Sequence, residues 1–390
     1  MSGETGSDNE KKVNFKRCFA YASIVTALAY LFSHLLMYDI SSVSAFSSME
    51  KSLDFELSDV YNSVAQRRAE RVLSDDVVLV SVDSCSRTRI AQVIEAVDFF
   101  APRVMGLDVL FNFPAESDEV LIDAIRGCSN LVLPVLIADD EFVGSYFYDL
   151  LPATQSYAAI NLSIASVRNV VREFHPFFTV GDSVVCGMTA RLAEEAAPQA
   201  FAELKRRGRK TETIRFPSIE FLIVPASDIL TPAGELIPDA APLIEDKIVL
   251  IGNLYDWTDE HLTPVETVSG LQIHAHALQT VLDGSYIGLI PADWSWELAI
   301  AICFAFAFFG AWMKEFDLKG DSLLLRIVQI VAILIFMWIG CYVFLRNGNY
   351  FDFAPSMLMI GLGMLALDIW MGVIDAWGFY RKKRKQNHNP

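Results

Sequence analysis

The sequence VVLVSVD at residues 77–83 is a continuous apolar run that ends in an acid. VMGLDVLF at residues 104–111, which contains Asp108, and LVLPVLI at residues 131–137 are further apolar runs. Apolar runs of this length without polar alternation are typical of parallel strands that are buried on both faces. Between the first two runs, apolar residues recur at helical spacing, at Ile90, Val93, Ile94 and Val97. The order strand, helix, strand predicts right-handed parallel crossovers and an α/β fold.

The remaining elements complete one α/β domain over residues 39–291, with a mixed, largely parallel sheet. In its first half the pattern predicts a helical stalk at 47–71, a helix with a capping box at 117–126 and paired strands at 157–162 and 166–173. In its second half it predicts a helix at 183–196, an exposed charged extension at 201–210, an edge strand at 213–216, a buried strand at 247–252 and a helix at 270–282. Ser84 or Ser86 is expected to cap the helix after the first strand. Arg168 and Arg172 are expected on the exposed face of the paired strands.

Four apolar segments are long enough to cross a membrane. A hydrocarbon core of roughly 30 Å needs about 20 apolar residues in a helix. Segments close to that length occupy residues 18–38, 294–313, 327–345 and 354–373. The sequence therefore predicts four transmembrane helices, one before the α/β domain and three after it.

Basic residues near the ends of these segments predict their orientation. They precede the first segment (Lys16, Arg17), separate the second from the third (Lys314, Lys319, Arg326) and follow the fourth in the run RKKRK at residues 381–385. With four spans, all three groups fall on the cytoplasmic side, so the tails 1–17 and 376–390 are cytoplasmic and the α/β domain is extracytoplasmic. A cleaved signal peptide ending near Val43–Ala45 is the alternative to the first span. We favour an anchor because the apolar stretch exceeds the usual core of a signal peptide, and cleavage would leave the sidedness unchanged.

Charge restricts the classes of partner. Residues 39–291 contain 18 Lys and Arg against 37 Asp and Glu, a formal charge of −19, whereas the whole chain carries −17. An acidic domain repels nucleic acid and anionic lipid, so no nucleic-acid partner is expected, whereas a cationic or metal-bearing ligand is permitted. Cys85, Cys128 and Cys186 lie outside the predicted spans without metal-ligand spacing. At most one disulfide can form among them, and the sequence does not decide whether one does.

Several polar residues fall where ligands bind in open parallel sheets, beyond the carboxyl ends of the strands. Asp83 ends the first strand, Asp108 lies inside the second, and Asp259 and His261 follow the strand at 247–252. His274 is expected on the inner face of the last helix. One hypothesis is a metal or small-ligand site built from these residues. The alternative, which we favour, is structural: Asp83 and Asp259 cap turns, Asp108 accepts backbone hydrogen bonds, and His274 is satisfied in the core.

The same residues resemble a known family. The runs at 77–83, 104–111 and 131–134, followed by KIVLIG at 247–252, DEHLTP at 259–264 and GLQIHA at 270–275, are similar to the second type of CHASE domain. That family is an extracellular sensory module first noted in bacterial histidine kinases and cyclases. The resemblance covers about residues 53–282, and its usual membrane layout is one span before the domain and three after it. It implies that Asp83, Asp108, Asp259, Thr263 and His274 are motif positions, but it assigns no ligand to them.

Two departures from the family pattern affect the functional interpretation. Many members carry a Trp-Pro-Trp-type motif after the first strand, where this chain has SCSRTR at residues 84–89. Members also commonly continue into a cytoplasmic kinase, cyclase or phosphatase, whereas this chain continues only to Pro390. The resemblance therefore implies a stand-alone sensor without an output domain of its own.

Ionisable residues within membrane spans are candidates for a function, but each first needs a hydrogen-bonding or charged partner, because lipid does not solvate it. Arg326 enters the third span from the inner side, and Asp368 lies about two turns from the inner end of the fourth. Since adjacent antiparallel helices would bring them together, we expect an Arg326–Asp368 contact. His34 and Glu297 lie near the outer ends of the first two spans.

Three functions remain open from the sequence. The first is a sensor in a bacterial cytoplasmic membrane that binds a small molecule or an envelope protein and relays to a separate cytoplasmic or membrane output protein, in keeping with a homodimer. The second is a non-catalytic envelope scaffold or assembly subunit. The third and least favoured is an exported metal-dependent hydrolase, because it needs the acidic cluster to bind a cation. No motif for nucleophilic catalysis is recognised either. No cofactor and no ligand can be named from the sequence.

Overall fold

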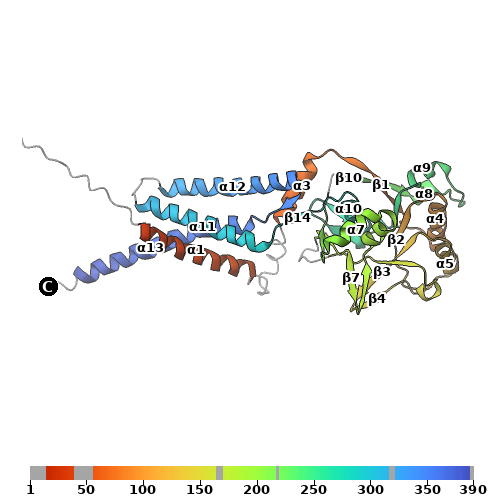
Figure 1. Ribbon diagram of the computed structural model, residues 1–390, viewed down its shortest axis with the longest axis horizontal. Helices are drawn as coiled ribbons and strands as arrows, with labels where there is room; N and C mark the ends of the chain where they lie inside the picture. The colour runs from red at the N-terminus through yellow and green to blue at the C-terminus, as the bar shows by residue number, and fades with distance from the viewer. Residues whose placement is uncertain (1–14, 39–55, 164–169, 217–218, 316–320, 387–390) are drawn as a thin grey trace, which may run out of the picture. The chain divides into compact units, whose positions relative to one another are not determined.

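A computed structural model describes residues 15–38, 56–163, 170–216, 219–315 and 321–386. The chain divides into two compact units. One consists of residues Met1–Leu57 and Gly288–Pro390, and the other of residues Ser58–Ile287. The first contains long apolar helices and the second an α/β fold (Figure 1).

The α/β unit is organised around one sheet with the strand order β10-β1-β11-β2-β3-β4, in which β5 also pairs with β3. Its strands are β1 (Val72–Ser81), β2 (Val104–Asp108), β3 (Leu131–Ala138), β4 (Glu141–Val143), β5 (Ser156–Ala159), β10 (Ile219–Pro225) and β11 (Ile248–Gly252). The described pairings are parallel except that between β3 and β4, which is an antiparallel hairpin. The predicted mixed, largely parallel sheet is therefore confirmed.

Helices cover both faces of this sheet because successive side chains of a strand point to opposite sides. Val78 and Val80 of β1 pack into one core with α4, α5, α8 and α9, whereas Val77 and Leu79 pack into a second core with α6, α7 and α10. The helices are α4 (Arg87–Phe99), α5 (Asp118–Gly127), α6 (Met188–Ala196), α7 (Pro198–Arg207), α8 (Ala226–Ile229), α9 (Ala241–Ile244) and α10 (Gly270–Leu282). Burial on both faces explains why the strand sequences are continuous apolar runs.

Short elements complete the unit. They are the helix α3 (Leu57–Arg68), the 3₁₀ turns η3 (Tyr148–Leu150), η4 (Pro238–Ala240) and η5 (Trp257–Asp259), and the strands β6 (Glu173–Phe174), β7 (Phe177–Val180), β8 (Ser183–Cys186), β9 (Glu212–Thr213), β12 (Glu260–Leu262) and β13 (Thr267–Ser269). The helix α3 lies within the predicted stalk at 47–71, whose residues 47–55 fall outside the described residues. β1 begins at Val72, directly after this stalk.

The N-terminal cap of α4 agrees with the prediction, whereas that of α5 does not. Ser86 caps α4, and its hydroxyl accepts a hydrogen bond from the Arg89 N–H at 3.2 Å. The capping box predicted for Ser117 is wrong, because Ser117 makes no side-chain cap hydrogen bond and is not extended. The carboxylate of Asp118, the first residue of α5, instead accepts from the Ala115 N–H and from the Arg87 guanidinium, which ties the start of the helix to the segment before it.

The predicted pairing of strands 157–162 and 166–173 is wrong within the described residues. Ser156–Ala159 pairs with β3 and extends the main sheet, and a single bridge links Ser163 to Glu173. Arg172, predicted to be exposed, is only 8% exposed. Arg168 lies outside the described residues. A parallel neighbour in the main sheet buries more apolar surface than a free hairpin does, which explains the different partner.

The predicted helix at 183–196 is two elements. Ser183–Cys186 forms β8, which pairs with β7, and the helix α6 starts only at Met188. Gly187 separates them, and a Cβ at this position would lie 2.5 Å from the His175 carbonyl oxygen. The predicted extension at 201–210 largely falls in the helix α7, and the predicted edge strand at 213–216 is reduced to β9. The strand β10, at the edge of the main sheet, was not predicted.

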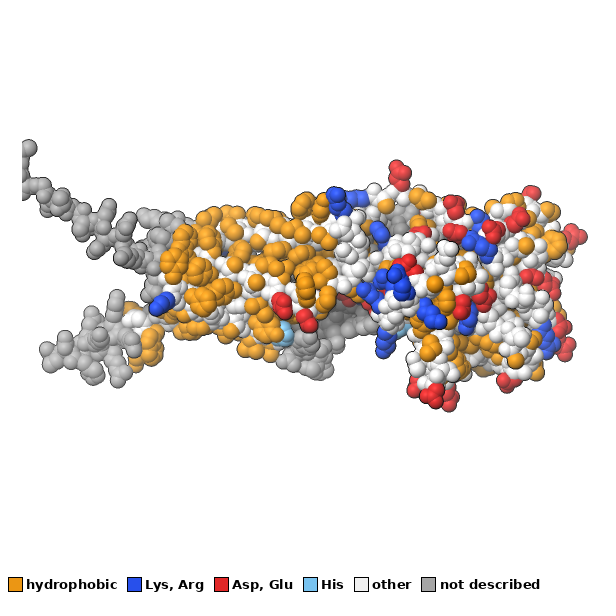
Figure 2. All heavy atoms as spheres, in the orientation of Figure 1, with side chains coloured by type: hydrophobic (Ala, Val, Ile, Leu, Met, Phe, Trp, Pro, Cys, Tyr) orange, Lys and Arg blue, Asp and Glu red, His pale blue; other side chains and the backbone are white. Residues whose placement is uncertain are grey.

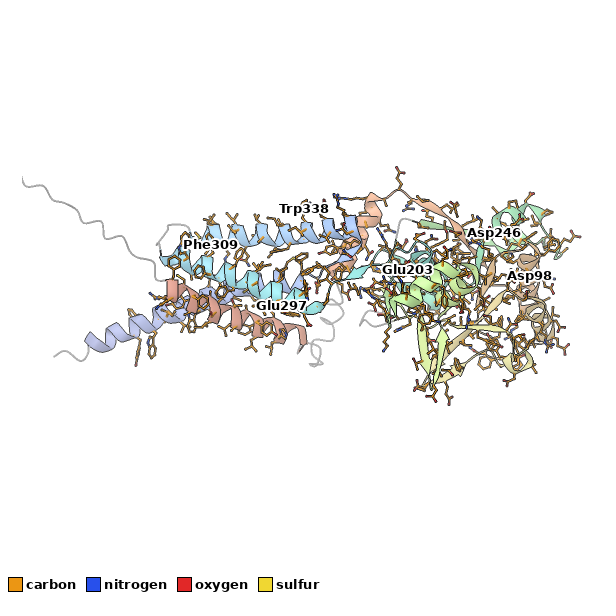
Figure 3. All side chains as sticks on the ribbon, viewed as in Figure 1. Asp98, Glu203, Asp246, Glu297, Phe309 and Trp338 are labelled. Carbon is orange, nitrogen blue, oxygen red and sulfur yellow. The ribbon has the colours of Figure 1, made fainter. Side chains whose placement is uncertain are left out.

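The membrane unit contains α1 (Phe15–Tyr38), α11 (Ala292–Glu315), α12 (Asp321–Asn347) and α13 (Ala354–Gln386), with the short strands β14 (Gly288–Leu289) and β15 (Asn349–Tyr350). All four helices are long and apolar enough to cross a membrane. Figure 2 shows hydrophobic side chains over the visible face of these helices. Phe309 and Trp338, for example, are 41% and 66% exposed (Figure 3). Such exposed apolar surface is what lipid covers in a multi-pass membrane protein.

Small residues allow α1, α11 and α13 to pack closely. Ala22, Ala307 and Ala366 share one buried cluster among these helices. A Cβ at Gly363 of α13 would lie 2.8 Å from the Cys303 Sγ of α11, so glycine permits this approach.

Candidate functional site

The hairpin β12–β13 carries two of the predicted site residues, His261 and Thr263, and Thr263 closes its turn. The Thr263 hydroxyl donates to the Glu266 carbonyl oxygen at 2.6 Å and accepts from the Glu266 N–H at 3.1 Å. Both groups of the turn are therefore satisfied by one side chain. Thr263 is only 9% exposed, and its role in this arrangement is to fix the turn.

Asp259 joins this hairpin to the start of α10. One carboxylate oxygen accepts from the Gly270 N–H at 3.0 Å, and the other lies 3.1 Å from the His261 Nε2. A negative charge at the N-terminus of a helix is stabilised by the exposed N–H groups and the helix dipole. A Cβ at Gly270 would lie 2.9 Å from both Asp259 oxygens, so only glycine leaves room for this contact.

Asp108 and His274 lie near Asp259 and His261 and are more buried than Asp259. Asp108 ends β2, and its carboxyl group is enclosed by protein atoms although the residue keeps some contact with solvent. This desolvation raises the pKa of Asp108 above its ordinary value, while the nearby His274 ring opposes the rise and the Asp259 charge adds to it. Among the described residues, no hydrogen bond reaches the Asp108 carboxyl group, so the predicted backbone hydrogen bonds are not found there. His274 of α10 is 6% exposed.

Asp83 has a different environment. It accepts from the backbone N–H groups of Leu254 and Tyr255 at 3.0 and 2.9 Å, and from the Ser81 hydroxyl. Asp83 thereby fixes the loop that follows β11, as the structural alternative predicts. It does not join the charges that act on Asp108, which come from His274, Asp259 and His261.

The predicted site is therefore only partly assembled. Asp108, Asp259, His261 and His274 form one group, here called the strand-end cluster, whereas Asp83 and Thr263 serve neighbouring loops. Within the described part of the chain, no group of three or more His, Cys, Asp or Glu residues has the geometry to hold a metal ion. Cys85, Cys128 and Cys186 are free thiols.

An ion pair that sequence reasoning missed fastens α3 next to this cluster. The Arg172 Nε and Nη2 each donate to one Asp59 carboxylate oxygen at 2.8 Å, and the two side chains are 10% and 14% exposed. Further along α3, the Ser63 hydroxyl donates to the Pro264 carbonyl oxygen at 3.1 Å. The bridge between Val170 and Leu262 places the Arg172 segment against β12. No local pattern marks Arg172 as buried, because its partner is distant in the sequence.

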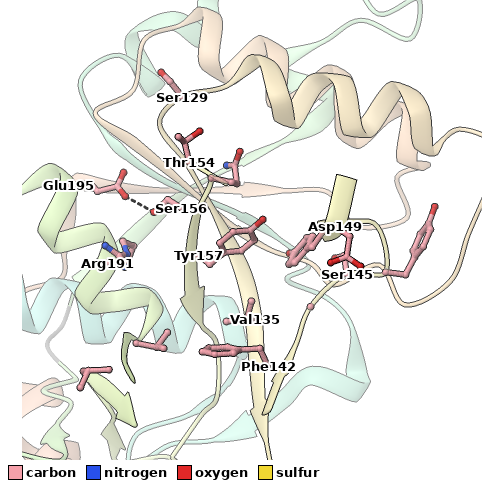
Figure 4. Close-up of a pocket in the computed structure, with 16 residues that line it drawn as sticks. Ser129, Val135, Phe142, Ser145, Asp149, Thr154, Ser156, Tyr157, Arg191 and Glu195 are labelled. Atoms are coloured by element: carbon pink, nitrogen blue, oxygen red, sulfur yellow. Dashed lines mark hydrogen bonds between the residues drawn. The ribbon is translucent and has the colours of Figure 1, made fainter. Parts of the chain in front are cut away.

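A cleft of about 900 Å³ lies at the edge of the sheet beside β4 and β5 (Figure 4). Its lining residues include Phe142, Tyr148, Asp149, Tyr157, Arg191 and Glu195. None of the six predicted ligand-binding candidates lines it. The aromatic and charged residues of this cleft come from β4, η3, β5 and α6, so no single stretch of sequence indicated it.

The structure places the predicted intramembrane pair in contact. The Arg326 Nη2 of α12 donates to the Asp368 Oδ2 of α13 at 2.6 Å. Near the first span, the His34 ring lies 4.4 Å from the Trp296 ring, while Glu297 is exposed.

Comparison with known proteins supports the family resemblance. The family model described as the CHASE2 domain matches residues 35–312, which is well over half of the chain. No curated protein and no solved structure gave a match. CHASE2 is a sensory and not a catalytic domain, and the four apolar helices fit a multi-pass membrane protein that carries it outside the cytoplasm. The chain belongs to the CHASE2 domain family.

Proposed function

We propose that this protein is a membrane-anchored sensor that recognises a ligand outside the cell membrane and relays the event to a separate cytoplasmic or membrane partner. The observation that carries the proposal is the position of the hairpin β12–β13. This hairpin contacts both segments through which the α/β unit continues into the membrane helices, α3 and α10.

Each contact is specific. Toward α3, the Pro264 carbonyl oxygen in the turn of the hairpin accepts a hydrogen bond from the Ser63 hydroxyl. The strand β12 also lies against the segment that contains Arg172, which forms the ion pair with Asp59 of α3. Toward α10, Asp259 accepts the N–H of Gly270, the first residue of that helix. In chain order α3 follows α1, and α10 precedes α11. A change at the strand-end cluster would therefore act on the two connections to the membrane together.

Such a relay requires two states with different affinities for the ligand. Helix displacements of one or two ångströms are the usual size of such signals, and packed interfaces convert them into discrete states. We place the protein in a bacterial cytoplasmic membrane with the domain on the outer side, because the basic residues flanking the spans predict that orientation. The proposal includes a homodimer, in which the membrane helices of one protomer could shift against those of the other.

The relay is tested by hydrogen exchange of residues 374–386, measured by mass spectrometry on the full chain in lipid nanodiscs. Arg172→Gln removes one half of the buried ion pair. Arg126→Gln is the matched control, because its ion pair with Asp123 is exposed on α5. We expect Arg172→Gln, and not Arg126→Gln, to change the exchange rate of 374–386 at least about twofold. Equal rates in the two variants would contradict coupling through α3.

Cross-linking in cells separates the relay from an envelope scaffold. A photoreactive amino acid replaces Trp377 in α13 or Asp140 at the tip of the β3–β4 hairpin. The relay predicts a partner captured from position 377 whose yield changes in Arg172→Gln. Partners captured only from position 140, with equal yields in both backgrounds, would instead favour the scaffold.

A further inference from the structure

The cleft beside β5 has an aromatic floor that is held in place by backbone contacts. The Tyr148 hydroxyl donates to the Pro134 carbonyl oxygen at 2.8 Å, and its ring lies 5.2 Å from the Tyr157 ring. A Cβ at Gly144 would overlap the Tyr148 ring, so glycine lets this ring lie flat against the chain. Phe142 of β4 adds a third ring, which is 51% exposed. Aromatic faces fixed in this way are ready to receive a ligand without rearrangement.

Two carboxylates flank this floor. Figure 4 shows Tyr157 between Glu195 and Arg191 of α6 on one side and Asp149 on the other. The Ser156 hydroxyl donates to Glu195 at 2.7 Å and orients it. Burial raises the pKa of the Tyr157 phenol, and the Asp149 charge raises it further, which agrees with a carboxylate beside the ring. Across the described residues, neither Asp149 nor Glu195 has a cationic partner.

Among the described residues that line the cleft, Arg191 is the only basic one, and it does not compensate these charges. Arg191 forms an ion pair with Glu194, which lies next to Glu195 on α6. The cleft therefore keeps an excess of negative charge together with π faces. A cation is attracted to such faces, most strongly where carboxylates are also within reach. Val135, Val184 and Val185 provide apolar surface for the rest of a ligand.

We infer that this cleft is a binding site for a small organic cation, an amine or quaternary ammonium compound with an apolar body. The inference rests on the proposed sensor function, because it supplies the ligand class that such a sensor would recognise. The ammonium group would lie against Tyr157 between Asp149 and Glu195, and the apolar body against the valines.

The test is calorimetric titration of the full chain in nanodiscs with choline and with 3,3-dimethylbutan-1-ol, which has the same shape without the charge. Glucose is the neutral polar probe. We expect choline to bind at least about tenfold more tightly than its uncharged isostere. Glu195→Gln and Asp149→Asn should each weaken choline binding about fivefold, and Tyr157→Leu should weaken it as well. The amide oxygen introduced by Glu195→Gln can still accept from Ser156, so this variant keeps the local hydrogen bond.

Glu119→Gln is the control, because it removes one negative charge from an exposed position of α5 outside the cleft. Absence of choline binding overturns the inference. So does equal binding of choline and its isostere, tighter binding of glucose, or equal losses in Glu195→Gln and Glu119→Gln. These outcomes are independent of the relay, which is measured by the exchange of residues 374–386 in Arg172→Gln. If choline binds but Arg172→Gln leaves the exchange rate of residues 374–386 unchanged, the relay is refuted and the cleft assignment stays in place.

Discussion

Arg172 and Asp59 form a two-point ion pair, from Nε to Oδ1 and from Nη2 to Oδ2 at 2.8 Å each, that joins α3 to the segment before β6. Both side chains are largely buried, at 10% and 14% exposure. Planar guanidinium and carboxylate groups paired in this way fix orientation as well as distance. The pair therefore fixes α3 against the segment before β6 within the α/β unit.

The first prediction concerns the stability of this pair. Arg172→Ala removes the guanidinium from a largely buried carboxylate, and removing one half of a buried pair costs about 3–5 kcal/mol. The double variant Asp59→Ala with Arg172→Ala should cost less than the sum of the single variants, because the interaction between the two residues can be lost only once. Urea unfolding of the three variants measures this difference. Additive costs would show that the two residues do not interact.

The second prediction concerns Asp108 and pH. Because burial raises its pKa above 3.8 in the folded state, the folded protein binds more protons than the unfolded chain over the window above 3.8. Stability should therefore fall as pH rises through that window. Asp108→Asn removes this loss, so its melting temperature should exceed that of the wild type at pH 7 and approach it near pH 4. A variant that is equally destabilised at both pH values would refute the assignment.

The third prediction concerns acid stability and His276. Burial lowers the pKa of this imidazole from 6.5 to about 4, and its Nδ1 has no hydrogen-bond partner among the described residues. Its ring packs between Phe216 and Phe221, with centroids 5.4 and 4.9 Å away. The unfolded chain binds the proton first, so about 3 kcal/mol of stability is lost as pH falls from 6.5 to 4. His276→Leu should reduce that loss.

Denaturant titrations at pH 7, 5.5 and 4 measure the effect. His175→Gln is the control, because it removes an imidazole that is less buried than His276. An equal gain in the free energy of unfolding at pH 4 in both variants would contradict the prediction that the burial of His276 causes the loss.

The fourth prediction concerns Gly270. An added Cβ would lie 2.9 Å from the Asp259 oxygens, so Gly270→Ala must displace this carboxylate from the start of α10. We expect a destabilisation of about 1–3 kcal/mol, as for overpacking elsewhere. Gly127→Ala is the control, since nothing lies within 4 Å of its Cβ and alanine favours the helix by up to about 1 kcal/mol. Equal thermal stability of the two variants would contradict the contact.

The fifth prediction concerns the intramembrane pair. Arg326→Asp and Asp368→Arg each place two like charges at a contact that now measures 2.6 Å, and a membrane interior cannot solvate them. Each single variant should lower the amount of protein in the membrane, and the double reversal should restore it. Immunoblots of membrane fractions measure this. Harmless single reversals would show that the pair is not required.

The strength of the sequence signal depended on how completely an element is buried. β2, β11 and the second half of β1 could be recognised from continuous apolar runs, because strands covered on both faces have no polar alternation. The first half of β1, residues 72–76, is partly exposed and was not predicted. β10 could not be recognised, because it lies at the edge of the sheet and mixes half-buried with exposed residues. The predicted start of α6 lies five residues before its actual start at Met188. The sequence of β8 also fits a helical pattern, and only its pairing with β7 shows that it is a strand.

By itself, the sequence determined the α/β class, the four apolar helices and the family, because each depends on residues close together in the chain. It also predicted that Asp108, Asp259, His261 and His274 lie at one end of the sheet, since they follow or face recognisable strands. The tertiary structure alone decided that Arg172 is buried, because its partner Asp59 lies 113 positions away. It likewise decided that Tyr148, Tyr157 and Glu195 share one cleft, because three separate elements must fold before their side chains meet.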